Sequence, residues 1–333
     1  MTNVIDTLSV VVVTYGDRWQ YLCRVLDLLE QDIYVSKVIV IDNASKYCVA
    51  DYCNKHLFRK IFVYRNKSNL GSSGGFSKGI SLACEDNPSL IMLLDDDNLP
   101  RPDSIKGLTE TYKRLAENDI YKSYIVLAFR EVLHHKFRLP IKPMFMHRKD
   151  FLCFNVFNAF QRYFKLTKVE SNPQSGPEYA EFSGGVAYSG MLFSPGMVSV
   201  VGLPETDFVL YFDDFEYSLR MLKAGYTIWL DRQNAVDDLI ENYSASAYKT
   251  PFLGFLLANS DNKIYYNIRN RVYLDHFVDH KVSVPYVVNK IIFLLIFVLL
   301  CLLTLRFKRL KTVIDACHDG QNGHLGLSSG YRI

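Results

Sequence analysis

The chain has little excess of charge of either sign, and it has no cysteines at metal-binding spacing. The formal net charge is +3 at pH 7 over 333 residues, which is too small to indicate a nucleic-acid partner. The seven cysteines are scattered, and none forms a CxxC pair. An odd number of cysteines without zinc spacing favours reduced thiols in a cytosol over a disulfide framework.

Internal repeats and low-complexity segments are also missing, and the composition does not indicate disorder. Apolar residues make up 49% of the chain and charged residues 22%, which are ordinary proportions for a globular protein. Residues 1–7 are largely polar, and the apolar run Leu8–Val13 is too short for a signal peptide and has no basic residues before it. We therefore expect the protein to start inside the cell, with a strand close to its first residue.

One long apolar run stands near the other end of the chain, at Ile291–Leu305. As a helix it would be about 22 Å long, which is shorter than the roughly 30 Å hydrocarbon core of a bilayer. Extension to 284–305 approaches a full span, although Asn289 and Lys290 interrupt it. The basic residues that follow are Arg306, Lys308, Arg309 and Lys311. We expect a helix embedded in or inserted through the cytoplasmic face of a membrane; a helix buried in the core or in a dimer interface is the alternative.

Short apolar strands and helical patterns alternate along the first 115 residues. The expected strands are Leu8–Val13, Lys37–Ile41, Lys60–Tyr64 and Leu90–Leu94, and the expected helices are Trp19–Glu30 and Phe76–Glu85. This alternation is typical of a mostly parallel, doubly wound α/β sheet with right-handed crossovers. Because polar or glycine residues follow each strand, we expect ligand chemistry at the carboxyl edge of the sheet.

A basic, aromatic stretch interrupts this order at residues 130–170, where side chains such as Arg138 and Lys149 are interleaved with Phe137 and Phe151. Such an insertion suits contact with lipid headgroups or with an anionic lipid-linked acceptor. A solvated hairpin packed on its own aromatics is an equal alternative. Regular patterning returns at 181–195 and continues through 208–230.

Three consecutive carboxylates, Asp95, Asp96 and Asp97, follow the apolar run Ile91–Leu94. Buried strands do not normally end in stacked negative charge, because like charges this close repel one another and cannot all be desolvated unpaired. A divalent cation removes the difficulty, since carboxylate oxygens are natural ligands for Mg²⁺ or Mn²⁺. An acidic turn closed by Asn98-Leu99-Pro100 is the alternative.

Polar or glycine-rich segments also follow the other predicted strands. Val11–Tyr15 ends the first strand and precedes Gly16-Asp17-Arg18, which suits a nucleotide base and ribose, although alone it fits an ordinary turn. Asp42–Ser45 ends the second strand with hydrogen-bonding side chains. The glycines of Asn69–Phe76 let the backbone pass close to a ligand ahead of a helix N-terminus, where negative charge is favoured. No Gly-Lys-Ser/Thr follows, so this turn is not a P-loop.

A second acidic group opens an amphipathic helix within Tyr211–Arg220. Acidic residues at a helix N-terminus are stabilised by the helix dipole, so simple capping is one interpretation. Asp213, Asp214 and Glu216 exceed what capping needs. One of them is a candidate general base for a hydroxyl nucleophile.

Together these segments resemble glycosyltransferase family 2, whose members have the GT-A fold and invert the configuration at the sugar carbon. The matching segments are Val13–Tyr15, Asp42–Ser45, Asn69–Phe76, Leu94–Asp97, Asp213–Glu216 and Gly225-Tyr226, in the order of the family across about residues 8–240. The triple aspartate, the glycine turn, Tyr266–Asn270 and Asp315–Gly326 are similar to the galactofuranosyltransferase and rhamnosyltransferase branch, which builds surface polysaccharides.

The resemblance implies a role for each matching residue. Asp95 and Asp97 would ligate Mn²⁺ or Mg²⁺ on the diphosphate of a nucleotide-sugar, Asp214 would be the base and Glu216 would orient hydroxyls, with Asp213 beside them. The expected nucleotide-sugar contacts are Thr14, Tyr15, Arg18, Asp42, Asn43, Asn69, Gly71, Gly74, Gly75, Asp95 and Asp96. The expected acceptor contacts are Tyr188, Ser189 and Gly190.

The sequence departs from the family pattern at the third metal ligand. Members of this branch often supply a histidine about two dozen residues after the base, and Asn234–Leu239 stands there instead. A carboxylate suits Mg²⁺ or Mn²⁺ at least as well as imidazole. We therefore expect Asp237 to complete the site.

The expected protein has a GT-A catalytic domain at 1–240 and a helical, membrane-associating region at 241–333. Within the first, 1–115 is the nucleotide-sugar half, 130–170 the insertion and 180–240 the acceptor half. We expect transfer of galactofuranose from UDP-galactofuranose to a lipid-linked oligosaccharide, in O-antigen or capsule synthesis at the cytoplasmic face of a bacterial inner membrane.

Three alternatives to this function are open. Rhamnosyl transfer from dTDP-rhamnose is the first. A sugar nucleotidylyltransferase is disfavoured because the loop Thr14–Arg18 lacks a glycine-rich, basic signature. A non-catalytic membrane-attached assembly protein is disfavoured because both acidic groups are intact.

Overall fold

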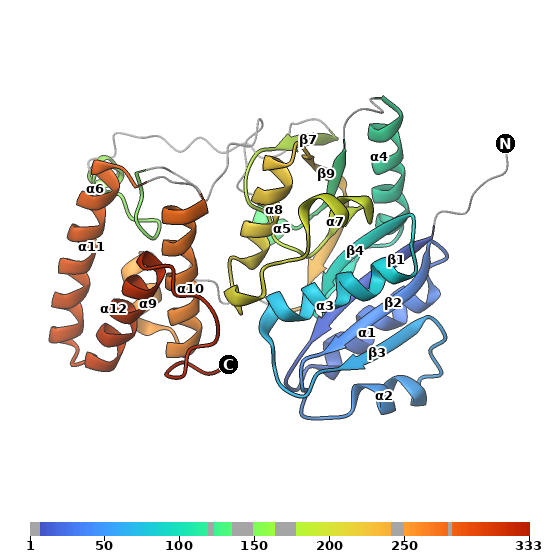
Figure 1. Cartoon of the computed structure of the whole chain (residues 1–333), viewed down its shortest axis with the longest axis horizontal. Helices are drawn as coiled ribbons and strands as arrows, with labels where there is room; N and C mark the ends of the chain where they lie inside the picture. Colours follow the sequence, from blue (N-terminus) through green and yellow to red (C-terminus); the bar gives the residue numbers. More distant parts are fainter. Residues whose placement is uncertain (1–6, 119–122, 135–148, 164–177, 241–249, 279–281) are drawn as a thin grey trace.

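The computed structural model describes residues 7–118, 123–134, 149–163, 178–240, 250–278 and 282–333. Among the described residues, those within 7–134 and 178–238 form a sheet with helices on both faces, and those within 251–321 form a separate group of helices beside it (Figure 1). The aromatic insertion lies mostly outside the described residues; its described parts include the short helices α5 (Glu131–His134) and α6 (Val156–Tyr163).

The first half of the sheet is parallel, as the sequence predicts. Its strands are β1 (Leu8–Thr14), β2 (Val35–Asp42), β3 (Ile61–Arg65) and β4 (Leu90–Asp95), in the order β3-β2-β1-β4. β1 is buried along its whole length and consists mainly of valine, as is typical of a central parallel strand covered on both faces. β3 lies at the edge and is only partly buried.

The second half of the sheet is mixed. Its strands are β5 (Asn98–Pro100), β6 (Tyr124–Phe129), β7 (Tyr179–Phe182), β8 (Met191–Phe193) and β9 (Thr227–Asp238). β8 runs antiparallel between β4 and β6, while β6 and β9 are parallel. β5 and β7 each pair antiparallel with β9. The predicted α/β, Rossmann-like fold is confirmed. The antiparallel strands were not predicted from the pattern of the first 115 residues.

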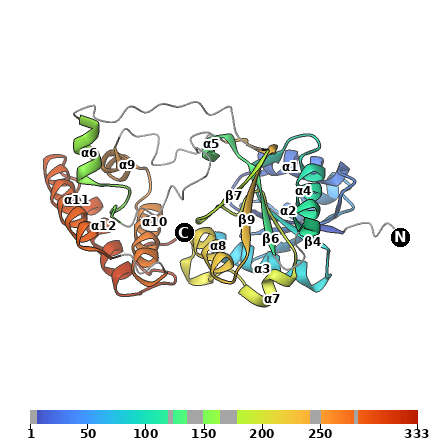
Figure 2. The ribbon, with the colours of Figure 1, turned by 90° about the horizontal axis from the view of Figure 1, so that it is seen from above.

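Helices cover the two faces of the sheet (Figure 2). On one face lie α1 (Trp19–Gln31), α2 (Val49–Lys55) and α4 (Ser104–Asn118); on the other lie α3 (Gly71–Glu85), α7 (Gly196–Val201) and α8 (Asp213–Lys223). α1 buries Leu22, Val25, Leu26 and Leu29, which recur at helical spacing. Two apolar cores result, one on each face of the sheet.

The second group of helices has its own apolar core. It contains α9 (Pro251–Leu257), α10 (Asp261–Tyr273), α11 (Val284–Leu303) and α12 (Phe307–Gln321), and α6 lies next to α11 (Figure 1). Phe293 and Phe297 of α11 are buried in this core together with Phe151. Val209 from the sheet domain also belongs to the core, which joins the two parts.

Only one side of α11 packs against this core. Tyr286, Asn289, Phe293, Phe297 and Cys301 are buried, at spacings of three and four residues. The amide of Asn289 donates to the Lys149 carbonyl at 2.7 Å and accepts from the Val156 N–H at 2.9 Å. The polar residue that interrupts the apolar run therefore anchors the helix.

The opposite side of α11 is apolar and exposed. Leu295 is 65% exposed, Leu299 56% and Leu303 72%. Within the described residues, α11 is the one helix long and apolar enough to cross a membrane, with a mean hydropathy of 2.7.

Candidate active site

The carboxyl ends of three parallel strands meet at one edge of the sheet. In the strand register Thr14 of β1 is opposite Asp42 of β2, and Val13 is opposite Asp95 of β4. This register brings together two of the segments that the sequence predicts to contact a nucleotide and the triple aspartate. In an open α/β sheet this edge is the usual position of a ligand.

The triple aspartate is held by the end of β1 and the start of α1. The Thr14 hydroxyl donates to Asp96 Oδ2 at 2.7 Å. Arg18, at the N-cap of α1, places Nη2 2.7 Å from Asp96 Oδ1 and 2.9 Å from Asp97 Oδ2. The backbone N–H of Asp95 donates to Ser189 Oγ at 3.1 Å. The predicted donor-contact residues Thr14 and Arg18 thus touch the aspartates directly.

Burial weakens the acidity of these carboxyl groups. It raises the pKa of Asp95 to about 6, a shift that the charge of Arg130 opposes. It raises the pKa of Asp96 to about 7, against the effects of Arg18 and Thr14. The charges of Arg18 and Arg130 therefore do not offset the burial of the cluster, and a divalent cation would supply the missing positive charge.

Arg18 also places Tyr15 beside the cluster. The Arg18 guanidinium lies over the Tyr15 ring, 5.2 Å from its centroid. Tyr15 is 40% exposed. An exposed aromatic ring next to a buried acidic cluster offers a flat apolar surface to a ligand.

Asp42 and Asn43 stabilise the glycine turn. Asp42 is buried, accepts from the Ser45 N–H at 2.7 Å and pairs with Arg65 at 2.7 Å. Asn43 Nδ2 donates to the Gly71 carbonyl at 2.8 Å, and Asn66 donates to Asn43 Oδ1 at 2.7 Å. The predicted donor residues at the end of β2 therefore shape the loop.

The glycine turn is the first turn of α3 rather than a loop ahead of it. The helix begins at Gly71, five residues before the predicted Phe76. Gly71 has φ +74°, and a Cβ there would lie 1.8 Å from the Val209 carbonyl oxygen. The predicted contact Asn69 accepts from the Gly71 N–H at 2.9 Å. Side chains are excluded at Gly74 and Gly75 too, where a Cβ would lie 2.6 Å from Leu70 and from Val13 respectively.

Ser72 joins this turn to the second acidic group. Its hydroxyl donates to Asp213 Oδ1 at 3.0 Å. Asp213 and Asp214 begin α8, and burial raises the pKa of Asp213 to about 7. Burial and the neighbouring Asp213 raise the pKa of Asp214 well above its usual range. A carboxylate with a raised pKa is a stronger base, so this pair suits proton abstraction.

The backbone before α8 is strained and is held by a buried asparagine. Val209, Tyr211 and Phe212 have φ values of 65°, 67° and 63°. The side-chain amide of Asn270 donates to the carbonyls of Phe208, Leu210 and Tyr211 at 2.8, 2.9 and 2.8 Å. The segment Tyr266–Asn270 entered the sequence prediction only as a resemblance, and its structural role is to position the start of α8.

Glu216 pairs with Arg220 one turn later on α8 and does not line the pocket. Arg220 Nε and Nη2 contact its two carboxylate oxygens at 2.6 and 2.9 Å. Arg220 also donates to the carbonyls of Val201 and Leu203. These two hydrogen bonds of Arg220 tie α8 to the end of α7 and the segment after it, and a direct role of Glu216 on hydroxyl groups stays a prediction.

The two aspartates at the end of β9 face opposite ways. Asp237, the expected third metal ligand, is 47% exposed and pairs through both oxygens with Arg101. Asp238 is buried: Oδ1 accepts from Asn98 at 2.7 Å and pairs with Arg130, while Oδ2 has no hydrogen-bond partner among the described residues. The charge of Asp238 contributes to the raised pKa of Asp95. Asp238 is therefore the buried carboxylate of the two, and its charge acts on Asp95, while a role of Asp237 as a metal ligand stays a prediction.

The predicted acceptor residues lie behind the cluster. Tyr188 is buried, with its ring centroid 4.4 Å from that of Phe76. Ser189 contacts the backbone of Asp95, and Gly190 has φ +86° at the start of β8. Their contact with an acceptor stays a prediction.

A pocket of about 460 Å³ lies beside the triple aspartate. Its lining includes Tyr15, Arg18, Asn43, Asn69, Gly71, Ser72, Asp95, Asp96, Asp97 and Tyr211. Asn262, Lys263, Arg332 and Ile333 also line it. These last four residues come from beyond 240 and belong to no motif, so the sequence contained no signal for them.

Comparison with protein families finds a match in the sheet domain. Residues 9–170 match the model of the family described as Glycosyl transferase family 2. The match lies mainly in the sheet domain and covers just under half of the chain. The family match ends before α8, so Asp213, Asp238 and the helices that follow lie outside it. The sequence matches no curated protein.

Solved structures share the fold of the sheet domain. GalNAc-T7 with UDP, GalNAc and Mn²⁺ is similar with a TM-score of 0.53 at 14% identity, over 82% of this chain and 48% of that chain. A mannosyltransferase from Pyrobaculum calidifontis with GDP-Man and Mn²⁺ has a TM-score of 0.50 at 15% identity, over 93% and 73%. The chain spans about half the length of the first structure. These likenesses establish the GT-A fold and no more.

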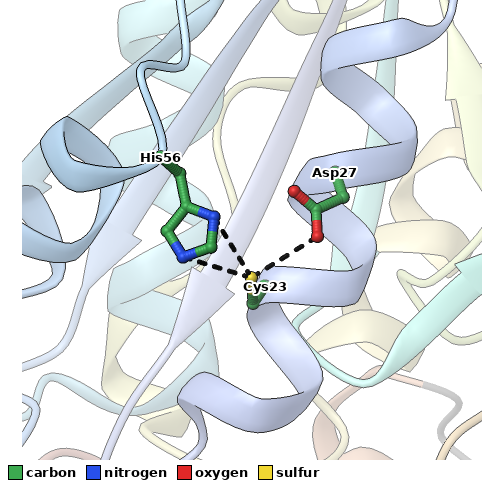
Figure 3. Close-up of side chains that lie close together, drawn as sticks. All are labelled: Cys23, Asp27 and His56. Carbon is green, nitrogen blue, oxygen red and sulfur yellow. Dashed lines mark hydrogen bonds between the residues drawn. The ribbon is translucent and has the colours of Figure 1, made fainter.

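A mixed group of potential metal ligands lies apart from the glycosyltransferase pocket, where α2 meets α1 (Figure 3). Cys23 Sγ lies 3.5 Å from Asp27 Oδ2 and 3.8 and 3.9 Å from the two ring nitrogens of His56. The His56 ring also stacks on Phe58, with 5.3 Å between centroids. These contacts pack the end of α2 on α1 and share no residue with the pocket.

Proposed function

We propose that the protein is a metal-dependent, inverting glycosyltransferase that moves a sugar from a nucleotide-sugar to a hydroxyl acceptor. The observation that carries the proposal is the Ser72 hydroxyl, which links a pocket lined by the first acidic group to the second acidic group. Asp95–Asp97 line the pocket beside Ser72, and the Ser72 hydroxyl bonds Asp213 at the start of α8. A cation-binding cluster next to a basic carboxylate is the arrangement that transfer from a nucleoside diphosphate needs.

In the proposed reaction, the acceptor oxygen bonds to the anomeric carbon while the bond from that carbon to the diphosphate breaks. The acceptor proton passes to Asp214, whose pKa is raised by burial and by Asp213. Attack from the face opposite the leaving group inverts the anomeric centre. Ser72 and the Asn270 contacts position the acidic pair for this step.

The residues present fit a divalent cation. Asp95 and Asp97 would hold Mn²⁺ or Mg²⁺, with the buried Asp238, whose Oδ2 has no partner among the described residues, as the proposed third ligand. The oxygens of these three carboxylates do not all lie within 4.8 Å of one another in the structure, so metal binding would have to bring them together. Bound there, the cation would act as a Lewis acid that stabilises the leaving diphosphate. The Mn²⁺ of the GalNAc-T7 and mannosyltransferase structures supports this metal class. In this proposal Asp238 is the third metal ligand, instead of Asp237, which the sequence predicted.

For the donor we favour UDP-galactofuranose, with dTDP-rhamnose as the alternative. The support is the likeness of Asn69–Phe76 and Tyr266–Asn270 to enzymes of that branch. The UDP and GDP-Man in the neighbouring structures support a nucleoside diphosphate donor. The acceptor we propose is a lipid-linked oligosaccharide in surface polysaccharide synthesis.

We place the enzyme on the cytoplasmic face of a bacterial inner membrane. The apolar side of α11 is exposed along the helix, and Lys308 and Lys311 are exposed after it. Because the other side of α11 packs in a protein core, we propose that the helix lies in the membrane interface rather than across the bilayer.

The test is a transfer assay with purified protein, Mn²⁺ or Mg²⁺, a panel of nucleotide-sugars and a lipid-linked acceptor. Transfer from one donor, with inversion seen by NMR of the product, is the expected result. Absence of transfer from every donor would refute the enzyme and favour the non-catalytic assembly protein.

Two variants separate the proposed roles. Asp97→Ala is expected to abolish donor binding, measured by calorimetry with Mn²⁺ present. Asp214→Asn is expected to keep donor binding and lose transfer, because an amide cannot accept the proton. Transfer at the wild-type rate by Asp214→Asn would show that another group is the base.

A further inference from the structure

We propose that Arg332 and Lys263 form a cationic wall that binds the diphosphate of the ligand in the aspartate pocket. The proposal rests on the proposed glycosyl transfer and adds a diphosphate-binding group outside the family-2 match. Its starting observation is that segment 326–333 returns from α12 to the sheet domain. Both views place the end of the chain between α10 and the sheet domain (Figure 1, Figure 2).

Segment 326–333 is fixed at its start by α10 and by the turn before α8. The Gly326 N–H donates to the Asp207 carbonyl at 2.7 Å. Arg269 Nη1 donates to the Gly326 carbonyl at 2.5 Å, and Nη2 of the same residue donates to Asp207 and Phe208. Arg269 is 1% exposed, so these contacts are buried.

The rest of the segment lies along α10. The Ser328 N–H donates to the Tyr266 hydroxyl at 3.1 Å. The Tyr331 ring stacks on Tyr265 with 4.1 Å between centroids and 10° between planes, and its hydroxyl donates to Asp315 at 2.9 Å. Asn262 donates to the Arg332 carbonyl. These contacts hold the backbone of Arg332 in place while its side chain stays exposed.

The positive charges of this wall are available to a ligand. Arg332 and Lys263 are exposed, line the pocket, and form no ion pair within the described residues. Arg18, the other cation of the lining, is committed to Asp96 and Asp97. The pocket therefore combines a row of carboxylates with two unpaired cations.

A metal-bound diphosphate matches both parts of this lining. Its cation would face the carboxylates, and its remaining oxygens would face a guanidinium and an ammonium. Arginine contacts phosphate oxygens in a bidentate manner, and lysine does so as a point charge. The donor carries such a group, and a lipid-diphosphate acceptor carries one too; we assign the wall to the donor because Arg332 and Lys263 share a pocket with the aspartates.

The test compares Arg332→Gln, Lys263→Gln and the double variant by calorimetry with UDP, uridine and inorganic pyrophosphate, each with Mn²⁺. Each single variant is expected to weaken UDP and pyrophosphate binding by roughly tenfold, and the double variant by more, because a charged hydrogen bond is lost. Uridine binding should not change. Arg59→Gln and Lys106→Gln, exposed residues of the sheet domain outside the pocket lining, are matched controls.

Tyr331→Ser provides a second measurement, since it frees the segment but keeps the guanidinium. Weaker UDP binding with an unchanged melting temperature is expected. Unchanged UDP and pyrophosphate affinity in the double variant would overturn the proposal. A rise only in the KM of the lipid-linked acceptor would assign the wall to the acceptor instead. If the wild-type protein transfers no sugar but binds pyrophosphate with Mn²⁺, and the variants lose that binding, the cationic wall is supported. The proposed glycosyltransferase function is then refuted.

Discussion

Asp237 and Asp238 are neighbours in β9, but their side chains lie in different surroundings. Successive side chains of a strand point to opposite faces, so adjacent aspartates of β9 meet different surroundings. Asp237 contacts Arg101 at the surface, and Asp238 is buried beside Asn98 and Arg130. The same residue type is thus a surface ion-pair partner at one position and a candidate metal ligand at the next.

Asp238→Asn is expected to weaken Mn²⁺ binding by roughly tenfold or more, because an amide oxygen carries no charge. Asp237→Asn is the matched control and should bind Mn²⁺ as the wild type does. Calorimetric titration with Mn²⁺ measures both. An equal loss in the two variants would contradict the assignment of Asp238.

The acidic cluster also predicts a pH dependence of stability. Burial raises the pKa of Asp95 to about 6 and of Asp96 to about 7, above the unfolded value of about 4. The folded state thus binds more protons, so without metal its stability falls as pH rises from about 4 through 7.

Mn²⁺ competes with those protons and reverses the trend. The Mn²⁺-induced rise in melting temperature should be small at pH 5.5 and large at pH 8. Thermal unfolding at both pH values, with and without Mn²⁺, measures this. Asp97→Ala should lose the rise at pH 8, and a rise independent of pH would argue against metal binding by these carboxylates.

Among the elements, α10 does the most to shape the pocket. Asn270 and Arg269 hold the turn before α8, and Asn262 and Tyr265 hold segment 326–333. One helix outside the glycosyltransferase domain match therefore positions both the acidic pair and the cationic wall.

Asn270→Ala is expected to destabilise the protein by about 2–3 kcal/mol, because three carbonyls of a strained turn lose their donor. Transfer activity should fall further than stability alone explains, since Asp214 follows that turn. Urea unfolding and initial rates measure the two effects. Asn267→Ala, on the same helix, is the control. Wild-type transfer by a folded Asn270→Ala variant would contradict this role.

The exposed side of α11 predicts membrane binding that can be removed without unfolding. Leu295→Glu with Leu299→Glu should abolish sedimentation with anionic vesicles, because charged groups are costly in the apolar interface. The melting temperature should stay near that of the wild type, since both side chains are more than half exposed. Ser199→Glu on α7 is the control. Vesicle binding by the double variant would refute the membrane role of α11.

At the scale of the whole molecule, the pocket is assembled from three distant parts of the chain. The end of the parallel strand β4 contributes the aspartates, Leu210 and Tyr211 before α8 contribute a second part, and residues from 260 to 333 close the other side. Sheet domain and helical group share Val209 in one apolar core. The pocket therefore depends on how the two parts pack together.

Much of the parallel half was predictable, and the mixed half was not. The strands at 8–13, 37–41, 60–64 and 90–94 are apolar and rich in β-branched residues, and each was found within one or two residues. β5 and β8 have three residues each, too short for any periodicity. The predicted start of α3 at Phe76 is later than the observed start at Gly71, because the first turn consists mainly of glycine and serine, which are typical of loops.

The sequence by itself determined the α/β class, the acidic cluster and the family resemblance, because alternating patterns and consecutive aspartates are local features. Only the tertiary structure decided that Asp238 is buried beside Asn98, that Arg220 pairs with Glu216 and that Arg332 reaches the pocket. Those outcomes depend on strand register and on contacts between residues far apart in the chain, and neither leaves a pattern in a short stretch of sequence.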